Sequence, residues 1–156
     1  MIYEIIHPIG NVEGIIEYVN GSKEIITFKN TILKLGRSAL ANSIGNNLGS
    51  AYSYYVNSMV WGNGGTSNGS PLFVNAERTG LFGTQQYQAP VISTIDNTQV
   101  IFTSVIPFNA SLTSGTVLNE MALVMANSNF YSMVTFPDLN KTSSMQITWN
   151  WHLSFI

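Results

Sequence analysis

The stretch MQITWNWHLSFI, Met145–Ile156, decides the fold of this chain. Apolar residues occupy every second position of it, and the residues between them are polar: the apolar ones are Met145, Ile147, Trp149, Trp151, Leu153 and Phe155. A period of two places successive side chains on opposite faces of a β-strand. Because an aromatic side chain buries roughly 150–250 Å², we expect Trp149, Trp151 and Phe155 in the core. Thr148 and Asn150 should face solvent or a neighbour.

The rest of the chain predicts further strands and a single helix. Strand patterns cover residues 2–7, 12–19, 23–28, 51–61, 87–94, 98–106, 117–126 and 130–136. Pro8 and Pro137 are expected to end two of these strands, and Asn20-Gly21 marks a hairpin turn because both residues tolerate positive φ. The helix is expected at about residues 30–45, capped by Asn30 or Thr31. This pattern predicts one domain over residues 1–156, an antiparallel β-sandwich or jelly-roll-like barrel.

Composition limits the classes of function. Charged residues make up 9% of the chain and the formal net charge is −2, against about 25% charged residues in typical domains. Without a basic stripe, binding of nucleic acid through its phosphates is not expected, and no apolar run reaches the roughly 18 residues of a membrane span. A surface so poor in charge suits a subunit packed in an assembly. It equally suits a plain β-rich protein with a neutral polar surface.

No motif predicts a metal or cofactor site. Cysteine is absent, and His7 and His152 lack the spacing of metal ligands. The run Gly62–Thr66 is glycine-rich and follows a strand pattern, but it lacks the Lys-Ser/Thr pair of a phosphate-binding loop. We interpret it as a flexible surface loop, and we expect neither a metal nor a cofactor.

Glu120 is the carboxylate that needs an explanation, because it interrupts the apolar run of residues 117–126. A charge at such a position should be paired or lie at an interface. We expect a structural ion pair with Arg78 or Lys141. A glycosidase would instead need a second carboxylate across a cleft, for which Glu77 and Asp138 are the candidates.

An aromatic cluster precedes the glycine-rich run, and it consists of Tyr52, Tyr54, Tyr55 and Trp61. Aromatic residues on strands can stack against sugar rings, which raises the alternative of a carbohydrate-binding module that recognises a host-surface glycan. Packing in the core accounts for the same residues with fewer assumptions.

Several segments, in their order along the chain, resemble small virion structural proteins of tailed bacteriophages. The helix region Phe28–Ile32 with Gly36 and Ala39–Ala41 resembles their "F-x-N-x-I…G…L-A" opening, and Met59–Thr66 resembles their "hydrophobic-G-x-G-x-T" strand and loop. The remaining matches are Leu72 with Glu77-Arg78 ("L…E…R"), Asn119–Leu123 ("x-E-x-x-L"), and Phe136-Pro137, Lys141-Thr142 and Ile147–Trp149 ("F-P…K…L-x-I-x-W", with Met145 in place of the first Leu).

The resemblance implies a non-enzymatic virion component of a tail fibre, tail tip or capsid exterior that contacts other virion proteins. It also implies a homo-oligomer, a trimer before a dimer. Residues 1–27 lie outside the pattern and are a candidate docking segment, unless residues 2–9 complete the domain's own sheet. The candidate interface residues are Ile2, Ile5, Ile6, Ile9, Tyr52, Tyr54, Trp61 and Phe73.

Overall fold

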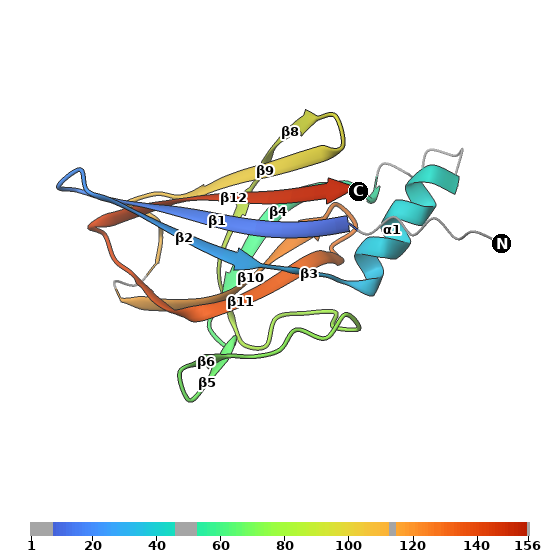
Figure 1. Ribbon diagram of the computed structural model, residues 1–156. Coiled ribbons are helices and arrows are strands. Elements are labelled where there is room, and N and C mark those ends of the chain that lie inside the picture. The colour runs from blue at the N-terminus through green and yellow to red at the C-terminus, as the bar shows by residue number, and fades with distance from the viewer. Residues whose placement is uncertain (1–7, 46–52, 113–114, 156) are drawn as a thin grey trace.

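Two five-stranded antiparallel sheets packed face to face form the body of the protein in a computed structural model (Figure 1). The structure describes residues 8–45, 53–112 and 115–155. One sheet, the β12 sheet, has the strand order β2-β1-β12-β9-β8. Its strands are β1 (Pro8–Tyr18), β2 (Lys23–Lys29), β8 (Ile92–Asp96), β9 (Gln99–Ile106) and β12 (Met145–Phe155).

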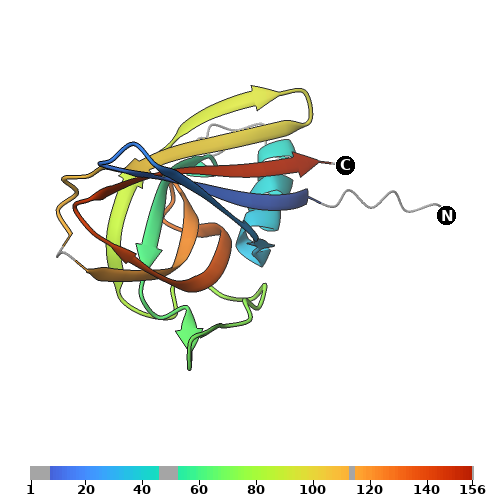
Figure 2. The same cartoon turned by 60° about the vertical axis from the view of Figure 1, so that its left-hand side comes forward.

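The other sheet, the β10 sheet, has the order β3-β11-β10-β4-β7. Its strands are β3 (Thr31–Ile32), β4 (Val56–Gly62), β7 (Gln85–Pro90), β10 (Thr116–Met125) and β11 (Phe130–Lys141). A small hairpin of β5 (Thr66–Ser67) and β6 (Ser70–Pro71) lies outside both sheets. Helix α1 (Lys34–Gly45) stands at the end of the sandwich where β1 begins and β12 ends, as both views show (Figures 1 and 2). The expectation of a mainly β antiparallel sandwich with one helix is therefore confirmed.

The core between the sheets is built around the aromatic residues of the last strand. Trp149 and Trp151 are completely buried, as predicted, and Phe155 is partly buried against the same core. The Trp149 ring lies 6.5 Å from that of Trp61 and 5.5 Å from that of Phe136, so it bridges the two sheets. Gly14, directly opposite Trp149 in the β1–β12 register, leaves room for this ring, because a Cβ there would lie 2.9 Å from it.

A second apolar cluster lies on the outer face of the β10 sheet. The connection between β4 and β7, residues 63–84, crosses this face, and we call it the strap. Val74 of the strap is buried there, with Leu81 and Phe82 packed beside it. Beneath them lie the sheet residues Val60, Ala122, Val124 and Met133, together with Leu33. This third layer explains why β10 is apolar on both faces, as the sequence indicates for a central strand.

The helix and several strands begin or end at other residues than predicted. The helix begins at Lys34, because residues 31–32 pair with β11 as β3 and the Asn30 side chain donates to the Ser132 hydroxyl in place of capping a helix. The strand predicted from residue 51 begins at Val56.

Both prolines lie in strands that they were expected to end. Pro8 is the first residue of β1, where a proline disturbs no ladder, and the strand predicted at residues 2–7 lies outside the described residues. Pro137 lies within β11, at an irregularity of the β10–β11 register between Leu118 and Glu120, so the strand continues to Lys141. No helix in the described part of the chain is long and apolar enough to cross a membrane.

Candidate functional site

The Glu120 carboxylate fastens the strap to the β10 sheet. Glu120 lies in β10 with no exposed surface. Its Oε1 accepts the backbone N–H groups of Gly64 and Gly83, each at 2.8 Å, and its Oε2 accepts that of Phe82 at 2.6 Å. One carboxylate thus binds both ends of the strap, near its beginning at Gly64 and near its end at residues 82–83.

Glycine lets the end of β4 and the start of the strap approach this closely. A Cβ on Gly62 would lie 2.6 Å from Oε1 of Glu120, and one on Gly65 would lie 2.2 Å from the Asn119 carbonyl oxygen. Both distances are far below an ordinary van der Waals contact. The glycine-rich run is therefore not the freely exposed loop that the sequence suggests, since it is packed around Glu120 and continues into the β5–β6 hairpin.

A second set of polar contacts surrounds the first. Asn119 is buried, and its Oδ1 accepts the Gly65 N–H at 2.7 Å. Its Nδ2 donates to Asp138 at 2.9 Å and to the Thr66 hydroxyl at 3.0 Å, and Thr66 also donates to Asp138 at 2.8 Å. The hydrogen bond from Asn119, and then that from Thr66, lowers the pKa of the exposed Asp138 carboxyl. We call Glu120, Asn119, Asp138 and the strap residues that they bind the Glu120 node.

The predicted ion pair of Glu120 with Arg78 or Lys141 is wrong. Arg78 lies near the node but donates to the carbonyl oxygens of Gly80 and Leu81, and its guanidinium stacks 3.4 Å from the centre of the Phe82 ring. Lys141 is buried elsewhere on β11, donates to the Thr142 carbonyl oxygen at 2.8 Å, and has its pKa lowered by burial. Three backbone amides supply the compensation that we expected from a cation.

The geometry of the node suits a structural role. Both oxygens of Glu120 are occupied by internal donors, and the residue has no exposed surface through which a substrate could reach it. The two carboxylates considered as glycosidase partners are also engaged. Asp138 accepts the hydrogen bonds from Asn119 and Thr66, and Glu77 forms an exposed ion pair with Lys34 at 3.2 Å.

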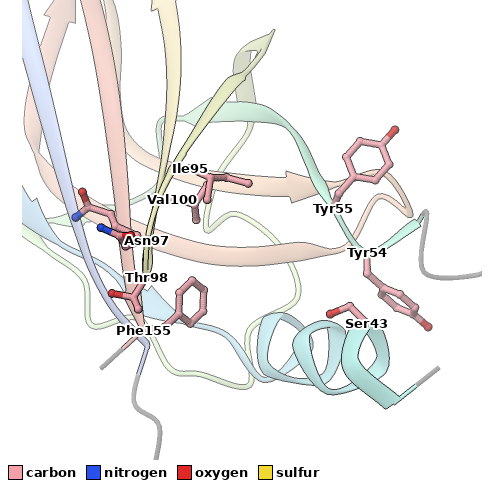
Figure 3. Close-up of a pocket in the computed structure, with 9 residues that line it drawn as sticks. Ser43, Tyr54, Tyr55, Ile95, Asn97, Thr98, Val100 and Phe155 are labelled. Atoms are coloured by element: carbon pink, nitrogen blue, oxygen red, sulfur yellow. The ribbon is translucent and has the colours of Figure 1, made fainter. Parts of the chain in front are cut away.

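The aromatic cluster predicted from the sequence is divided by the structure. Trp61 is completely buried between the sheets and therefore cannot be an interface residue. Tyr54 is partly buried against the core, whereas Tyr55 is 58% exposed. Both line an open groove of about 440 Å³ between α1 and the β8–β9 hairpin, where the Tyr54 ring extends toward the helix (Figure 3). Tyr52 lies outside the described residues.

Two other interface candidates are on the surface. Phe73 of the strap is 85% exposed and Ile9 of β1 is 52% exposed. Ile2, Ile5 and Ile6 lie outside the described residues, as does His7. His152 lies on the outer face of β12, opposite the core tryptophans, and no group of acidic or histidine side chains among the described residues could hold a metal ion.

Sequence reasoning missed the partners of Glu120 and the role of Asn119. The available signal was the coincidence of a buried acidic residue with a glycine-rich segment whose amides are free to bind a carboxylate. No family model matches the chain, and no curated protein or solved structure is significantly similar to it.

Proposed function

We propose that this protein is a non-enzymatic structural component of a tailed-phage virion, located on the tail or on the exterior of the capsid. It acts there as a homo-oligomer in contact with other virion proteins. The observation that carries the proposal is the Glu120 node, because it joins segments of the phage-protein pattern that are far apart in the sequence.

The node gives these short motifs a common physical purpose. Gly62–Thr66 supplies strap amides and the Thr66 hydroxyl, Asn119-Glu120 supplies the acceptors, and Asp138 follows directly after Phe136-Pro137. These residues hold the strap against the β10 sheet, so the fold itself requires them. This supports a structural reading of the pattern over a catalytic one.

Immunogold labelling of particles tests the proposal. Antibodies raised against the purified protein should label intact virions at one position, on the tail or on the capsid surface, and the protein should sediment with particles after washing in high salt. A protein found only in the soluble fraction of infected cells, with no label on particles, would contradict the proposal.

A second candidate function is recognition of a host-surface glycan at a fibre tip. The exposed ring of Tyr55 beside the groove favours it, because an accessible aromatic face can stack on a sugar ring. Glycan-array binding by the wild-type protein that disappears in Tyr55→Ala would support this function. Binding that is unchanged in Tyr55→Ala would place the glycan elsewhere, and an array without any signal would contradict the candidate.

A further inference from the structure

The edge strands of the two sheets differ in how well they are protected. An exposed strand edge presents unpaired N–H and C=O groups, and proteins usually guard it with charges, prolines, bulges or a very short strand. Edge strand β2 carries Lys23, Glu24 and Lys29, β3 has only two residues, and β7 ends at Pro90 after an irregularity in its register with β4.

Strand β8 is less well protected, because its one charge is that of Asp96 at its end. All five of its residues are exposed, and it contains no lysine, arginine or proline. Ile92 and Ile95 are 75% and 78% exposed. The β8–β9 hairpin projects at the border of the sandwich in both views, with the outer side of β8 unobstructed by any described element (Figures 1 and 2).

The register of the hairpin identifies the free backbone groups. Asp96 pairs with Gln99 across a two-residue turn, and hydrogen-bonded pairs alternate with non-hydrogen-bonded pairs along the ladder. The backbone groups of Asp96, Thr94 and Ile92 therefore bond to β9. Val91 agrees with this alternation, since its N–H donates away from β9 to the Asn57 carbonyl oxygen at 3.1 Å. Ser93 and Ile95 therefore direct both their N–H and C=O groups outward.

We propose that β8 pairs with β8 of a second copy of this chain, antiparallel and about a two-fold axis. Ser93 of each copy lies opposite Ile95 of the other, and Thr94 faces Thr94. This register uses every outward backbone group of Ser93 and Ile95. A shift by two residues toward the start of the strand would require Val91, whose N–H is already bonded to Asn57.

The side chains of β8 fit a second copy of the same strand. A two-fold axis perpendicular to the sheet places the same face of both copies on the same side of the joined sheet. Ile95 of each copy therefore lies beside the small Ser93 of the other. Ile95 already lines the apolar groove with Val100 and Phe155, and pairing would cover its exposed side chain. Asp96, the one charged residue of β8, lies opposite Ile92 of the other copy, so like charges do not meet.

This inference refines the homo-oligomer of the proposed function and rests on it. The contact is isologous and closes as a dimer, in place of the trimer that the resemblance implies. It joins two β12 sheets into one continuous sheet.

Single cysteine substitutions test the register of the β8–β8 pair, because the chain has no cysteine of its own. Two residues that face each other in a non-hydrogen-bonded antiparallel pair have Cα atoms about 4.5 Å apart, which is within the range of a disulfide. Under mild oxidation, Thr94→Cys should form a covalent dimer. Ile92→Cys, on the same strand but opposite Asp96, should stay unlinked.

Charge placed on the edge tests the contact itself. Ile95→Lys should abolish the dimer in native mass spectrometry and sedimentation velocity, since it brings ammonium groups to the paired edge. Ile25→Lys is the matched control on β2, the opposite edge of the same sheet, where Ile25 is 63% exposed. It should remain dimeric at concentrations where Ile95→Lys is monomeric, and both variants should keep the circular dichroism spectrum of the folded wild type.

Three results would overturn the β8 contact. They are a wild-type protein that stays monomeric at high concentration, an oligomer that survives Ile95→Lys, and a dimer that Ile92→Cys crosslinks while Thr94→Cys does not. Virion labelling is an independent measurement, so a failed β8 contact with labelled particles leaves the proposed virion location standing.

Discussion

The two sheets of the sandwich share one core but differ in what lies on their outer faces. The β10 sheet is buried on both sides, with the strap packed over Val60, Ala122 and Val124. The outer face of the β12 sheet carries Thr148, Asn150 and their cross-strand neighbours, and no described segment packs over it. Among the described residues, the sandwich therefore has a third layer over the β10 sheet and none over the β12 sheet.

The difference shows how a chain with few charges solubilises one face and buries another. On the bare face, neighbouring polar groups bond to one another across the strands, as Thr103 does to Asn150 at 2.9 Å and Asn150 to Glu13 at 3.2 Å. On the covered face, the buried side chains of Glu120 and Asn119 form their hydrogen bonds within the Glu120 node. The same polar substitution should consequently destabilise the protein much more on the covered face than on the bare face, and the following variants test this contrast.

The largest loss is expected at the shared core. Trp151→Ala should lower the free energy of unfolding by roughly 3–5 kcal/mol, as large-to-small changes in a core do. Thr148→Ala, on the opposite face of the same strand, should change it by less than about 0.5 kcal/mol. Urea unfolding followed by circular dichroism measures both. Near-native stability of Trp151→Ala would refute the packing between the sheets.

A pair of identical substitutions compares the two outer faces directly. Ala122→Asn places a larger amide under the strap, where it is overpacked and lacks partners, so a loss of about 3 kcal/mol is expected. Thr148→Asn makes the same side chain on the bare face, where water can solvate it, and should cost only a few tenths of a kcal/mol. Equal losses in chemical unfolding would mean that the strap does not seal the β10 sheet.

Glu120→Gln weakens the fastening of the strap without removing its volume. The glutamine carbonyl oxygen can still accept two N–H groups, but its NH₂ group opposes the third donor, which costs about 1–3 kcal/mol. Hydrogen exchange should show lost protection at the amides of Gly64, Phe82 and Gly83, with the β12 sheet unchanged. Glu77→Gln, an exposed carboxylate of the same strap, is the control and should leave these amides protected.

The best-predicted elements are those whose hydrophobic pattern reflects which of their faces are buried. The alternation in residues 145–155 indicates one covered face, and the apolar run of β10, which only Asn119 and Glu120 interrupt, indicates two. The Asn20-Gly21 turn was also predicted correctly, because both residues tolerate positive φ, and Gly21 has a φ of 84°.

The errors occur where distant segments decide the local structure. Asn30 binds Ser132 from the other end of the chain, so the helix begins later than its local cap signals indicate. Glu120 requires compensation, which the sequence shows, but the choice between a cation and three amides depends on where the strap crosses β10. Spacing along the chain carries no information on that crossing.

The smallest effect should come from the outermost part of the node and depend on pH. Asp138 links the β5–β6 hairpin to β11 through Thr66 and Asn119, and these hydrogen bonds lower its pKa below the ordinary value of 3.8. A carboxyl whose pKa is lower in the folded state binds fewer protons there than when unfolded. Its stabilisation is therefore present above about pH 4 and is lost as the pH falls through the folded-state pKa.

Asp138→Asn should accordingly melt slightly below the wild type at pH 7, and the two melting temperatures should converge as the pH falls below about 4. Thr66→Val keeps the carboxylate but removes one of its two donors, so it should lie between them and retain part of the pH dependence. Thermal melts from pH 2 to pH 7 provide the measurement. A difference between wild type and Asp138→Asn that does not change with pH would show that the carboxylate's charge contributes nothing, and that the strap is held at Glu120 and Asn119 alone.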